Sequence, residues 1–310
     1  MERQDQNTSF TLPKEADGWR TGYVSIIGRP NVGKSTLMNA LLGERLSIVT
    51  SKPQTTRQRI LGILSEPGVQ VIFVDTPGLL EPEYKLQEFM LRSAVRTIQE
   101  SDVTIAMVDA TRSLRDLDKA ITGHLTHSAG PVLLAINKID RIKKPQVLPL
   151  LDEARDRFPF SDLIPISALN RDGLEDLQAL VIERLPVAPP MYPPDMLTDQ
   201  PERFFVGEIV REHLFTALRD ELPYASAVQV DDFKDRDTGK TYIRATIVVE
   251  KKSQKAIIIG HKGHMLKKIG TAAKESIETF LERPVYLDLW VKVIPTWRKR
   301  ENDLKRLGYS

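Results

Sequence analysis

Residues 28–35 constrain the fold more than any other stretch of this chain. Gly28 and Gly33 are separated by four residues, and Lys34 and Ser35 follow directly. The apolar run YVSIIG leads into this motif and an amphipathic stretch follows it, so the glycine-bounded loop joins a strand to a helix. Glycines in such a loop let the backbone approach a phosphate chain, and successive N–H groups and the helix N-terminus attract the anion. The stretch therefore predicts a phosphate-binding loop in an α/β domain.

Length and composition indicate a soluble protein of two domains. The chain has 310 residues, of which 41% are hydrophobic and 28% are charged. Cysteine is absent, which excludes disulfides and thiolate metal sites and fits a reducing compartment. Residues 1–18 are polar and lack the apolar region of a secretory signal, so we expect a disordered lead-in. No apolar run approaches the ~18 residues of a membrane span. We expect a cytoplasmic protein.

Short apolar runs alternate with amphipathic stretches as far as residue 185. Strands that alternate with helices predict a mainly parallel sheet covered by helices on both faces. The expected strands are residues 23–28, 59–65, 69–75, 103–109, 131–137 and 163–167. The clearest expected helices are residues 86–99 and 173–185.

A proline-rich stretch separates this pattern from a different one. Residues 185–201 contain six prolines in 17 residues, which predicts an extended, semi-rigid linker. A helix, two strands, a helical stretch and a last strand are expected after it, which is a small α+β domain. We assign residues 19–185 to the first domain, 186–201 to the linker and 202–310 to the second domain.

Three further motifs follow predicted strands of the first domain. They are DTPG at residues 75–78, NKID at 137–140 and SAL at 167–169. A carboxylate at Asp75 can hold Mg²⁺ directly or through water, and the Gly78 N–H can reach a terminal phosphate. Each motif alone is a weak signal. Because all of them end strands at the edge where open α/β sheets bind ligands, together they indicate one nucleotide site.

Asp140 selects the base of that nucleotide. A carboxylate only accepts hydrogen bonds, and guanine presents two adjacent donors, N1–H and the exocyclic amine. Adenine presents an acceptor and a C–H there, and an unpaired buried polar group discriminates strongly. Asn137 and the backbone of Ser167 and Ala168 would complete the base pocket. GTP is therefore expected over ATP.

The whole set resembles the P-loop GTPases. Small signalling members carry a water-orienting Gln directly after D-x-x-G, where this chain has Leu79. The resemblance offers Asn31, which in several such GTPases helps hold K⁺ near the β- and γ-phosphates; its alternative role is to stabilise the loop. It also favours Thr56 over Thr55 as the residue that senses Mg²⁺. The implied catalytic residues are Asn31, Lys34, Thr56 and Gly78, and the Mg²⁺ ligands are Ser35, Thr56 and Asp75. The implied GTP-binding residues are Gly28, Asn31, Val32, Gly33, Lys34, Ser35, Thr36, Asp75, Gly78, Asn137, Lys138, Asp140, Ser167, Ala168 and Leu169.

The second domain contains a basic, glycine-bounded loop. Residues 251–310 carry a net charge of +8, and because the whole chain carries +2, the first 250 residues carry −6. GHKG at residues 260–263 follows an apolar run and precedes an amphipathic helix. Such a loop lets a nucleic-acid backbone come close, as in KH domains, which clamp about four nucleotides. The element order is that of a type II KH domain. The candidate RNA-binding residues are Gly260, His261, Lys262, Gly263, Lys267 and Lys268.

The tryptophans, the histidines and the basic tail of this domain each allow two interpretations. Trp290 and Trp297 are expected to pack in the core or an interface, with base stacking as the alternative. His261 and His264 fit loop or RNA contacts better than metal ligands, because no cluster of carboxylates or cysteines accompanies them. The basic tail from Arg298 to Arg306 either lies along phosphates or stays solvated.

A GTPase domain joined by a short linker to a KH domain resembles the Era family of ribosome-assembly GTPases over residues 20–300. The resemblance implies binding near the 3′ end of 16S ribosomal RNA, support of 30S subunit maturation, and GTP hydrolysis to GDP as a conformational switch. It also implies Mg²⁺, K⁺, and peripheral association with the inner face of the plasma membrane. Two other classes stay open. One is a membrane-surface GTPase whose basic C-terminus reads anionic lipid, and the other is a nucleotide kinase, which would need an acceptor pocket and a lid.

Overall fold

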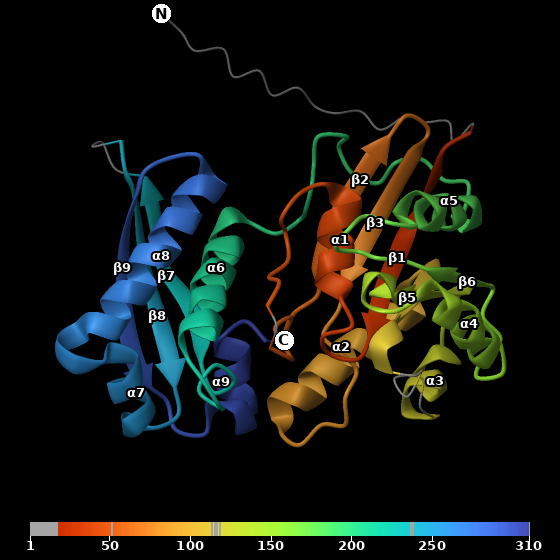
Figure 1. Ribbon diagram of the computed structural model, residues 1–310. Helices are drawn as coiled ribbons and strands as arrows, with labels where there is room; N and C mark the ends of the chain where they lie inside the picture. The colour runs from red at the N-terminus through yellow and green to blue at the C-terminus, as the bar shows by residue number, and fades with distance from the viewer. Residues whose placement is uncertain are drawn as a thin grey trace, which may run out of the picture.

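Two domains lie side by side in the structure, and a long connection runs between them (Figure 1). The structure is a computed structural model that describes residues 18–50, 52–112, 114, 117, 119–235 and 239–309. The lead-in expected at residues 1–18 therefore lies outside the described residues except for Gly18. The fold class expected from the sequence is confirmed: a nucleotide-binding α/β domain comes first and a smaller α+β domain follows.

The first domain is built on a six-stranded sheet. Its strand order is β2-β3-β1-β4-β5-β6, and every neighbouring pair is parallel except β2 with β3. The strands are β1 (Arg20–Gly28), β2 (Ile60–Glu66), β3 (Val69–Asp75), β4 (Val103–Asp109), β5 (Val132–Asn137) and β6 (Asp162–Pro165). Only β6 ends clearly earlier than predicted, because the Ser167 N–H bonds the Asp172 carbonyl and turns the chain.

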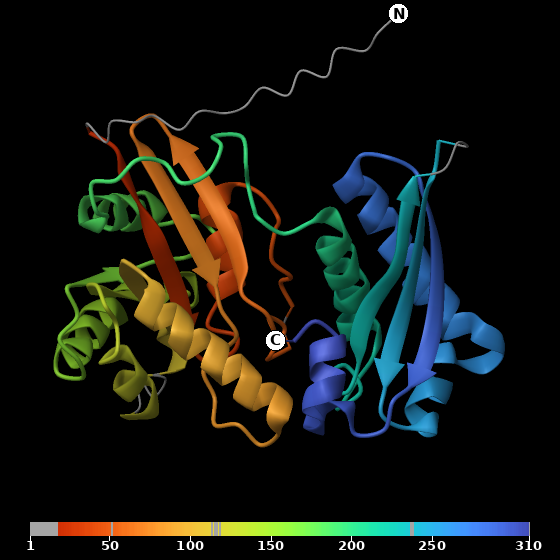
Figure 2. The same ribbon diagram turned by 180° about the vertical axis from the view of Figure 1, so that it is seen from behind.

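Helices cover both faces of this sheet (Figure 2). One buried cluster contains side chains of α1 and α5, and another contains side chains of α2, α3 and α4. The helices are α1 (Lys34–Leu42), α2 (Lys85–Glu100), α3 (Lys119–Leu125), α4 (Val147–Arg155) and α5 (Leu174–Arg184). Short 3₁₀ turns are η1 (Ala110–Arg112), η2 (Ile139–Arg141) and η3 (Lys144–Gln146). Helix α2 shows why its sequence is helical, since Leu86, Met90, Ala94 and Ile98 recur every fourth residue and are all buried.

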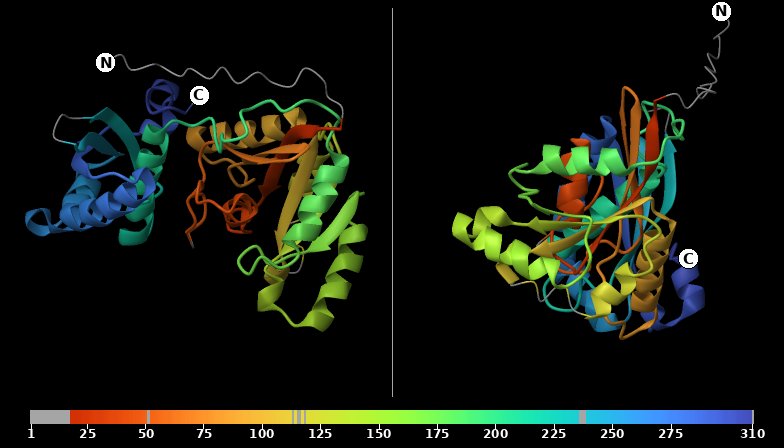
Figure 3. Two further views of the ribbon diagram at one scale, coloured as in Figure 1. Left: turned by 90° about the horizontal axis from the view of Figure 1, so that it is seen from above. Right: turned by 90° about the vertical axis from the view of Figure 1, so that its right-hand side faces the viewer.

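The second domain has a three-stranded sheet covered by helices on one face. The sheet order is β7-β8-β9, with β7 antiparallel and β9 parallel to β8. Its elements are α6 (Glu202–Ala217), β7 (Ala227–Asp235), β8 (Thr241–Val249), α7 (Lys252–Ile259), η4 (His261–Gly263), α8 (His264–Leu281) and β9 (Val285–Val293). This order agrees with the type II KH pattern expected from the sequence. Figure 3 shows α6, α7 and α8 on one side of the sheet and the C-terminal helix on the other.

The proline-rich connection is attached to the first domain and is not a free spacer. The buried side chain of Gln70 accepts from the N–H groups of Met191 (2.7 Å) and Tyr192 (2.9 Å) and donates to the Tyr192 carbonyl (2.8 Å). The Ile63 N–H bonds the Leu197 carbonyl at 2.8 Å. These contacts attach the extended, semi-rigid linker expected from the sequence to β2 and β3.

The C-terminal segment packs between the domains, where the sequence had suggested a solvated or phosphate-bound tail. It forms η5 (Trp297–Lys299) and α9 (Glu301–Arg306). Trp297 is fully buried, stacks on Tyr309 and donates to the Ala225 carbonyl at 3.0 Å. Leu86 and Met90 of α2 belong to the same apolar cluster. The packing expected of Trp297 is thus present, whereas the same expectation is wrong for Trp290, which is 60% exposed.

Replacing Gln70 with alanine is expected to lower the free energy of unfolding by about 1–3 kcal/mol, because it leaves partly buried backbone groups of the connection without partners. Chemical denaturation would measure the loss, and limited proteolysis between residues 186 and 201 should speed up. The control is Gln178→Ala, since Gln178 makes one hydrogen bond at the surface. A loss no larger than that of the control would contradict the role given to Gln70.

Candidate nucleotide and RNA sites

The loop between β1 and α1 has room for glycine alone at two positions. Gly28 (φ 149°) and Gly33 (φ 107°) adopt left-handed backbone conformations. A Cβ on Gly28 would lie 2.4 Å from the Met107 carbonyl oxygen, and one on Gly33 would lie 2.2 Å from Asn137 Nδ2. The loop therefore presses against β4 and β5, and its N–H groups precede the N-terminus of α1, the arrangement that binds phosphate.

Lys34 is the buried cation of this loop. Its Nζ donates to the carbonyl oxygens of Gly28 (3.2 Å) and Arg29 (3.0 Å), and the residue is 6% exposed. Burial lowers the pKa of Lys34 to about 8, although the nearby Asp75 carboxylate opposes that shift. A buried ammonium held only by carbonyls is well suited to meet the oxygens of a phosphate chain.

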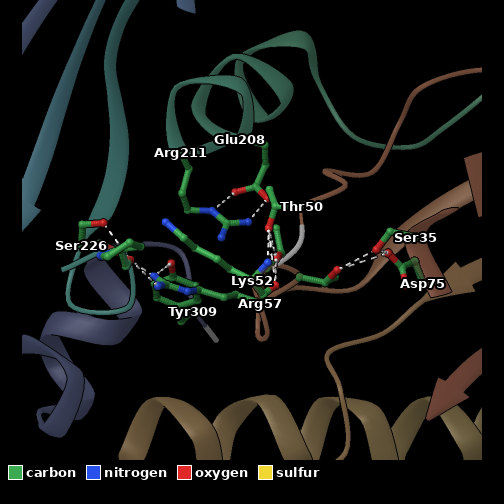
Figure 4. Close-up of polar contacts among 12 residues, drawn as sticks. Ser35, Thr50, Lys52, Arg57, Asp75, Glu208, Arg211, Ser226 and Tyr309 are labelled. Atoms are coloured by element: carbon green, nitrogen blue, oxygen red, sulfur yellow. Dashed lines mark hydrogen bonds and ion pairs between the residues drawn. The ribbon is translucent and has the colours of Figure 1, made fainter. Parts of the chain in front are cut away.

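Three oxygen-bearing side chains converge beside Lys34. Ser35 Oγ donates to Asp75 Oδ2 at 2.7 Å and lies 3.0 Å from Thr56 Oγ1, and Thr56 Oγ1 lies 3.4 Å from Asp75 Oδ2 (Figure 4). Asp75 Oδ1 is buried without a hydrogen-bond partner among the described residues. Burial raises the pKa of Asp75, and the Lys34 charge and the Ser35 hydrogen bond oppose that rise. Mg²⁺ prefers oxygen ligands, and one oxygen of the Asp75 carboxylate has no partner, so Ser35, Thr56 and Asp75 would fit as ligands of a Mg²⁺ ion.

Thr55, the alternative to Thr56, is engaged elsewhere. Its Oγ1 donates to the Lys52 carbonyl at 2.9 Å and lies 2.9 Å from Thr50 Oγ1. The geometry therefore favours Thr56, as the sequence did, although its role as a metal ligand stays a prediction.

The residues around the terminal-phosphate end form a tight turn. Gly78 packs against Pro30, where a Cβ would lie 2.7 Å from the Pro30 nitrogen. Leu79 is 2% exposed, belongs to a core cluster, and donates its N–H to the Gly28 carbonyl at 3.0 Å. Leu79 therefore faces the core and cannot orient water. Asn31 has φ 65°, which also fits the alternative that it shapes the loop.

Three side chains hold the base end together. Asn137 Nδ2 donates to the Val32 carbonyl (2.8 Å), and its Oδ1 accepts from the Ala168 N–H (2.9 Å). Ser167 Oγ donates to Asp140 Oδ1 at 2.6 Å. Asn137 thus ties the phosphate loop to the SAL loop, and the base contact expected of it stays a prediction. Asp140 is oriented by the SAL serine.

Lys138 is a second bridge at this end. Its Nζ donates to the Asn31 carbonyl and to Asp109 Oδ2, both at 2.6 Å. Burial favours a higher pKa for Asp109, but hydrogen bonds from Lys138 and Thr111 outweigh it and hold that pKa below the usual value. Asp109 was missed in the sequence, although it ends β4 at the same sheet edge as the motifs.

A cavity of about 630 Å³ joins these groups. Of the predicted residues, those that line it are Asn31, Gly33, Lys34, Ser35, Thr36, Thr56, Gly78, Lys138 and Leu169. The others, Gly28, Val32, Asp75, Asn137, Asp140, Ser167 and Ala168, are not among the lining residues. The lining also includes residues that sequence motifs did not indicate: Pro30, Ile48, Val49, Thr50, Gln54, Thr55, Asp109, Thr111, Arg112 and Arg141.

A groove of about 390 Å³ runs beside the GHKG loop of the second domain. Gly263, Lys267 and Lys274 line it together with Leu287 and Leu289 of β9. Lys274 was not predicted. His261, Lys262 and Lys268 are exposed next to the groove, and Gly260 (φ 72°) ends α7. Among the described residues, no group of three or more His, Asp or Glu side chains is arranged to hold a metal ion.

The loop that carries Thr56 is held by the second domain. The Arg57 guanidinium donates to the carbonyl oxygens of Ser226 (2.7 Å), Pro223 (3.2 Å) and Tyr224 (3.1 Å), and the residue is 3% exposed. Lys52 donates to two carbonyls at the C-terminal end of α6 (Figure 4). Thr56, which belongs to the cluster of Ser35 and Asp75, and Arg57, which contacts the second domain, are therefore adjacent in the chain.

Asp140→Asn is expected to weaken GTP affinity by roughly 10²- to 10⁴-fold, since two hydrogen bonds to a charged acceptor are lost at about 1.5–3 kcal/mol each. Xanthine nucleotides should bind better than GTP, because the amide can donate to their extra carbonyl while its oxygen still accepts from Ser167. Competition binding with both nucleotides measures this, with the exposed Asp152→Asn as control. Retention of the wild-type preference for GTP would contradict the role of Asp140.

Comparison with known proteins agrees with both sites. Residues 23–138 match the family of 50S ribosome-binding GTPases, and residues 221–298 match the KH domain family. GTPase Era of Geobacter metallireducens is 48% identical over 94% of this chain and 98% of its own length. GTPase Era of Halothermothrix orenii is 46% identical over 94% of this chain and 99% of its own length.

Solved structures show the same two-domain arrangement. A variant of Aquifex aeolicus Era bound to GDP·AlF4⁻ superposes with a TM-score of 0.91 and 42% identity, and covers 94% of this chain and 99% of its own. Era in complex with MgGDPNP and nucleotides 1506–1542 of 16S ribosomal RNA matches with the same TM-score, identity and coverage. The chain belongs to the Era family of GTPases.

Proposed function

We propose that this chain hydrolyses GTP, binds 16S ribosomal RNA near its 3′ end through the KH domain, and supports maturation of the 30S subunit. One observation carries the proposal: Thr56, in the cluster suited to Mg²⁺, is followed by Arg57, which is buried against the KH domain. A nucleotide site whose loop is held by the RNA-binding domain suits a factor that links hydrolysis to RNA release. The Era structures with GDP·AlF4⁻ and with MgGDPNP and 16S RNA support the assignment of ligands.

Hydrolysis would rest on position and charge. Phosphoryl transfer to water needs stabilisation of charge on the phosphate oxygens and little covalent participation by the protein. Lys34, the loop N–H groups and the Gly78 N–H are the donors that the cavity offers for this purpose. Mg²⁺, when bound, would neutralise further phosphate charge. Leu79 keeps water away from its own position, so another group must supply what Gln supplies in the small signalling GTPases.

We assign that contribution to K⁺ held with the help of Asn31. Asn31 lines the cavity, and its carbonyl is fixed by Lys138. A monovalent cation there would add the charge that an arginine finger adds in other GTPases.

Hydrolysis should be roughly tenfold or more faster in K⁺ than in Na⁺ at fixed Mg²⁺, because a site matched to the larger K⁺ would hold Na⁺ less well and the positive charge would then be missing at the phosphate oxygens. Asn31→Gly tests this better than alanine, since glycine accepts φ 65° and removes only the amide. The variant should hydrolyse GTP equally in both salts and keep its GDP affinity. A wild-type rate that is equal in K⁺ and Na⁺ would remove Asn31 from the mechanism.

The RNA role is tested at the exposed residues of the GHKG loop. His261→Asp with Lys262→Asp puts two carboxylates where RNA phosphates approach, so affinity for a 3′-terminal 16S fragment should fall at least about tenfold. Gly260 is a poorer target, because a Cβ there would lie 2.7 Å from Met265 Cβ and disturb the fold.

GDP affinity of this variant should stay unchanged. Lys143→Asp with Lys144→Asp, at exposed positions of the first domain, is the control for charge alone. Equal RNA affinity of the wild type and the His261/Lys262 variant would contradict the clamp. Co-sedimentation with 30S subunits then tests the ribosomal target.

The nucleotide state should control RNA affinity through Arg57. When the loop of Thr56 orders around Mg²⁺ and the γ-phosphate, Arg57 and the KH domain are held with it, and hydrolysis releases both. Linkage requires that RNA tighten binding of a GTP analogue by the same factor by which the analogue tightens RNA binding.

RNA affinity should differ roughly 5- to 150-fold between GDP and a non-hydrolysable GTP analogue, the range of typical couplings. Arg57→Ala should reduce that ratio towards one while GDP binding persists. The matched control is Arg45→Ala, because Arg45 also forms a pair across the domains, with Glu212, but is 68% exposed. Identical RNA affinities in both nucleotide states would leave two independent binding modules.

Peripheral association with the inner face of the plasma membrane stays a weaker proposal. Helices of the described residues are too short or too polar to cross a bilayer. In the basic C-terminal segment, Arg298 pairs with Glu250, Lys305 with Glu301 and Arg306 with Asp303. This internal pairing reduces the charge that the segment could offer to lipid. The test is to wash membranes and ribosomes with salt and to measure how much of the protein stays on each.

A further inference from the structure

The face of the KH sheet opposite α6, α7 and α8 carries three aromatic side chains. Along β9, Leu287 and Leu289 point to the groove, so Tyr286, Asp288 and Trp290 point to the opposite face. Tyr286 is 57% and Trp290 is 60% exposed. The helices α6, α7 and α8 lie on the other side of the sheet (Figure 3).

This aromatic face is held in a fixed arrangement. Tyr242 of β8 lies opposite Tyr286, and their rings stack with centroids 5.9 Å apart and planes at 14°. Asp288 Oδ2 accepts from Trp290 Nε1 at 2.9 Å and from the Tyr242 hydroxyl at 3.3 Å. Because the Asp288 carboxylate holds both the Trp290 N–H and the Tyr242 hydroxyl, the orientation of these two rings at the surface is fixed.

The surroundings suit a polyanion with flat bases more than a protein. The aliphatic residues of this face, Ala227 and Val248, are covered by the C-terminal segment. Asp232 is paired with Lys234 and Arg244. Lys292 is exposed on the same face and has no ion pair within the described chain. Protein interfaces are depleted of charge at their core, whereas aromatic rings beside basic side chains are the usual platform for single-stranded nucleic acid.

We propose that this face, formed by Tyr242, Tyr286, Trp290 and Lys292, is a second RNA site, which stacks bases of the strand that leaves the groove. The inference rests on the RNA binding proposed above. Strand β9 is the edge of the sheet, and its neighbouring residues Leu289 and Trp290 point to opposite faces, so an RNA strand can pass from the groove to the aromatic face around this one strand. A KH groove clamps about four nucleotides, whereas the RNA bound by the Era relative runs from nucleotide 1506 to 1542. A long RNA must therefore cross further surface, and this face is the adjoining one.

The test uses the full chain and two RNAs from the 3′-terminal region of 16S RNA, one of about four nucleotides that fills the groove and one of about twelve that extends beyond it. Tyr286→Ala with Trp290→Ala should lower affinity for the longer RNA roughly 10- to 100-fold, because stacking contributes about 1–3 kcal/mol per base. Affinity for the shorter RNA should be unchanged. Trp290→Phe, which keeps a ring, should retain most of the affinity.

Two further measurements separate stacking from other causes. The salt dependence of binding should keep its slope in the aromatic variant, whereas Lys292→Ala should reduce the slope by about one phosphate contact. Leu148→Ala, at a residue of α4 that is 69% exposed, controls for loss of surface hydrophobicity.

Equal loss for both RNAs, or no loss for either, would overturn the second site and leave the groove intact. A concentration-dependent dimer that the aromatic variant abolishes would also overturn it, by assigning the face to a second copy. If the wild type bound neither RNA, the proposed RNA function itself would fail.

Discussion

The buried guanidinium of Arg57 is the interaction on which the relation between the domains depends. A charge taken out of water is costly unless it is fully hydrogen-bonded, and here the partners are backbone carbonyls of residues 223, 224 and 226 together with the ring of Phe215. Loss of these partners together would leave the charge buried without hydrogen bonds, or would expose it by separating the domains. Because Thr56 precedes Arg57 directly, we expect a movement of either domain to reach the cluster of Ser35 and Asp75. In the same way, we expect a ligand that orders Thr56 to stabilise the contact between the domains.

Much of the nucleotide site could be predicted from the sequence, and the reason is topological. Parallel strands bring their carboxyl ends to one edge of the sheet, so motifs that end strands must meet there. Residues such as Asp75 and Asp140 could therefore be assigned without knowing the helices between them. What could not be predicted is which backbone groups the side chains of the site bind. Asn137 contacts the backbone of Val32 and Ala168, and backbone groups carry no side-chain signature. The partners of Arg57 are hidden for the same reason, since they are carbonyls more than 160 residues away.

The two tryptophans of the second domain differ in how far the sequence pattern determines their burial. In VYLDLWVKV the alternation of apolar and polar residues assigns Trp290 to the same phase as Tyr286, Asp288 and Lys292, which is the exposed one. A tryptophan is usually buried, but the alternation along β9 correctly assigns Trp290 to the exposed face. Trp297 lies outside any regular pattern, so its burial follows only from tertiary contacts with Ala225 and Tyr309. The linker is a similar case: prolines excluded a helix or a central strand, but only the side chain of Gln70, distant in sequence, determines that the segment is attached to the sheet.

The burial of Leu79 has a consequence for how hydrolysis can be regulated. In a GTPase with a mobile Gln at this position, one side chain can be moved in or out to control the attack of water. Here the residue is part of the core and its N–H is bound to Gly28, so that means of control is absent. The groups left at the phosphate end act by charge and position, and Thr56 is the one among them that lies on a loop held from outside its own domain. Control over hydrolysis is therefore best exerted on that loop, and the surface that holds it belongs to the KH domain. An RNA that alters the docking of this domain can then change the nucleotide site without supplying a catalytic group of its own.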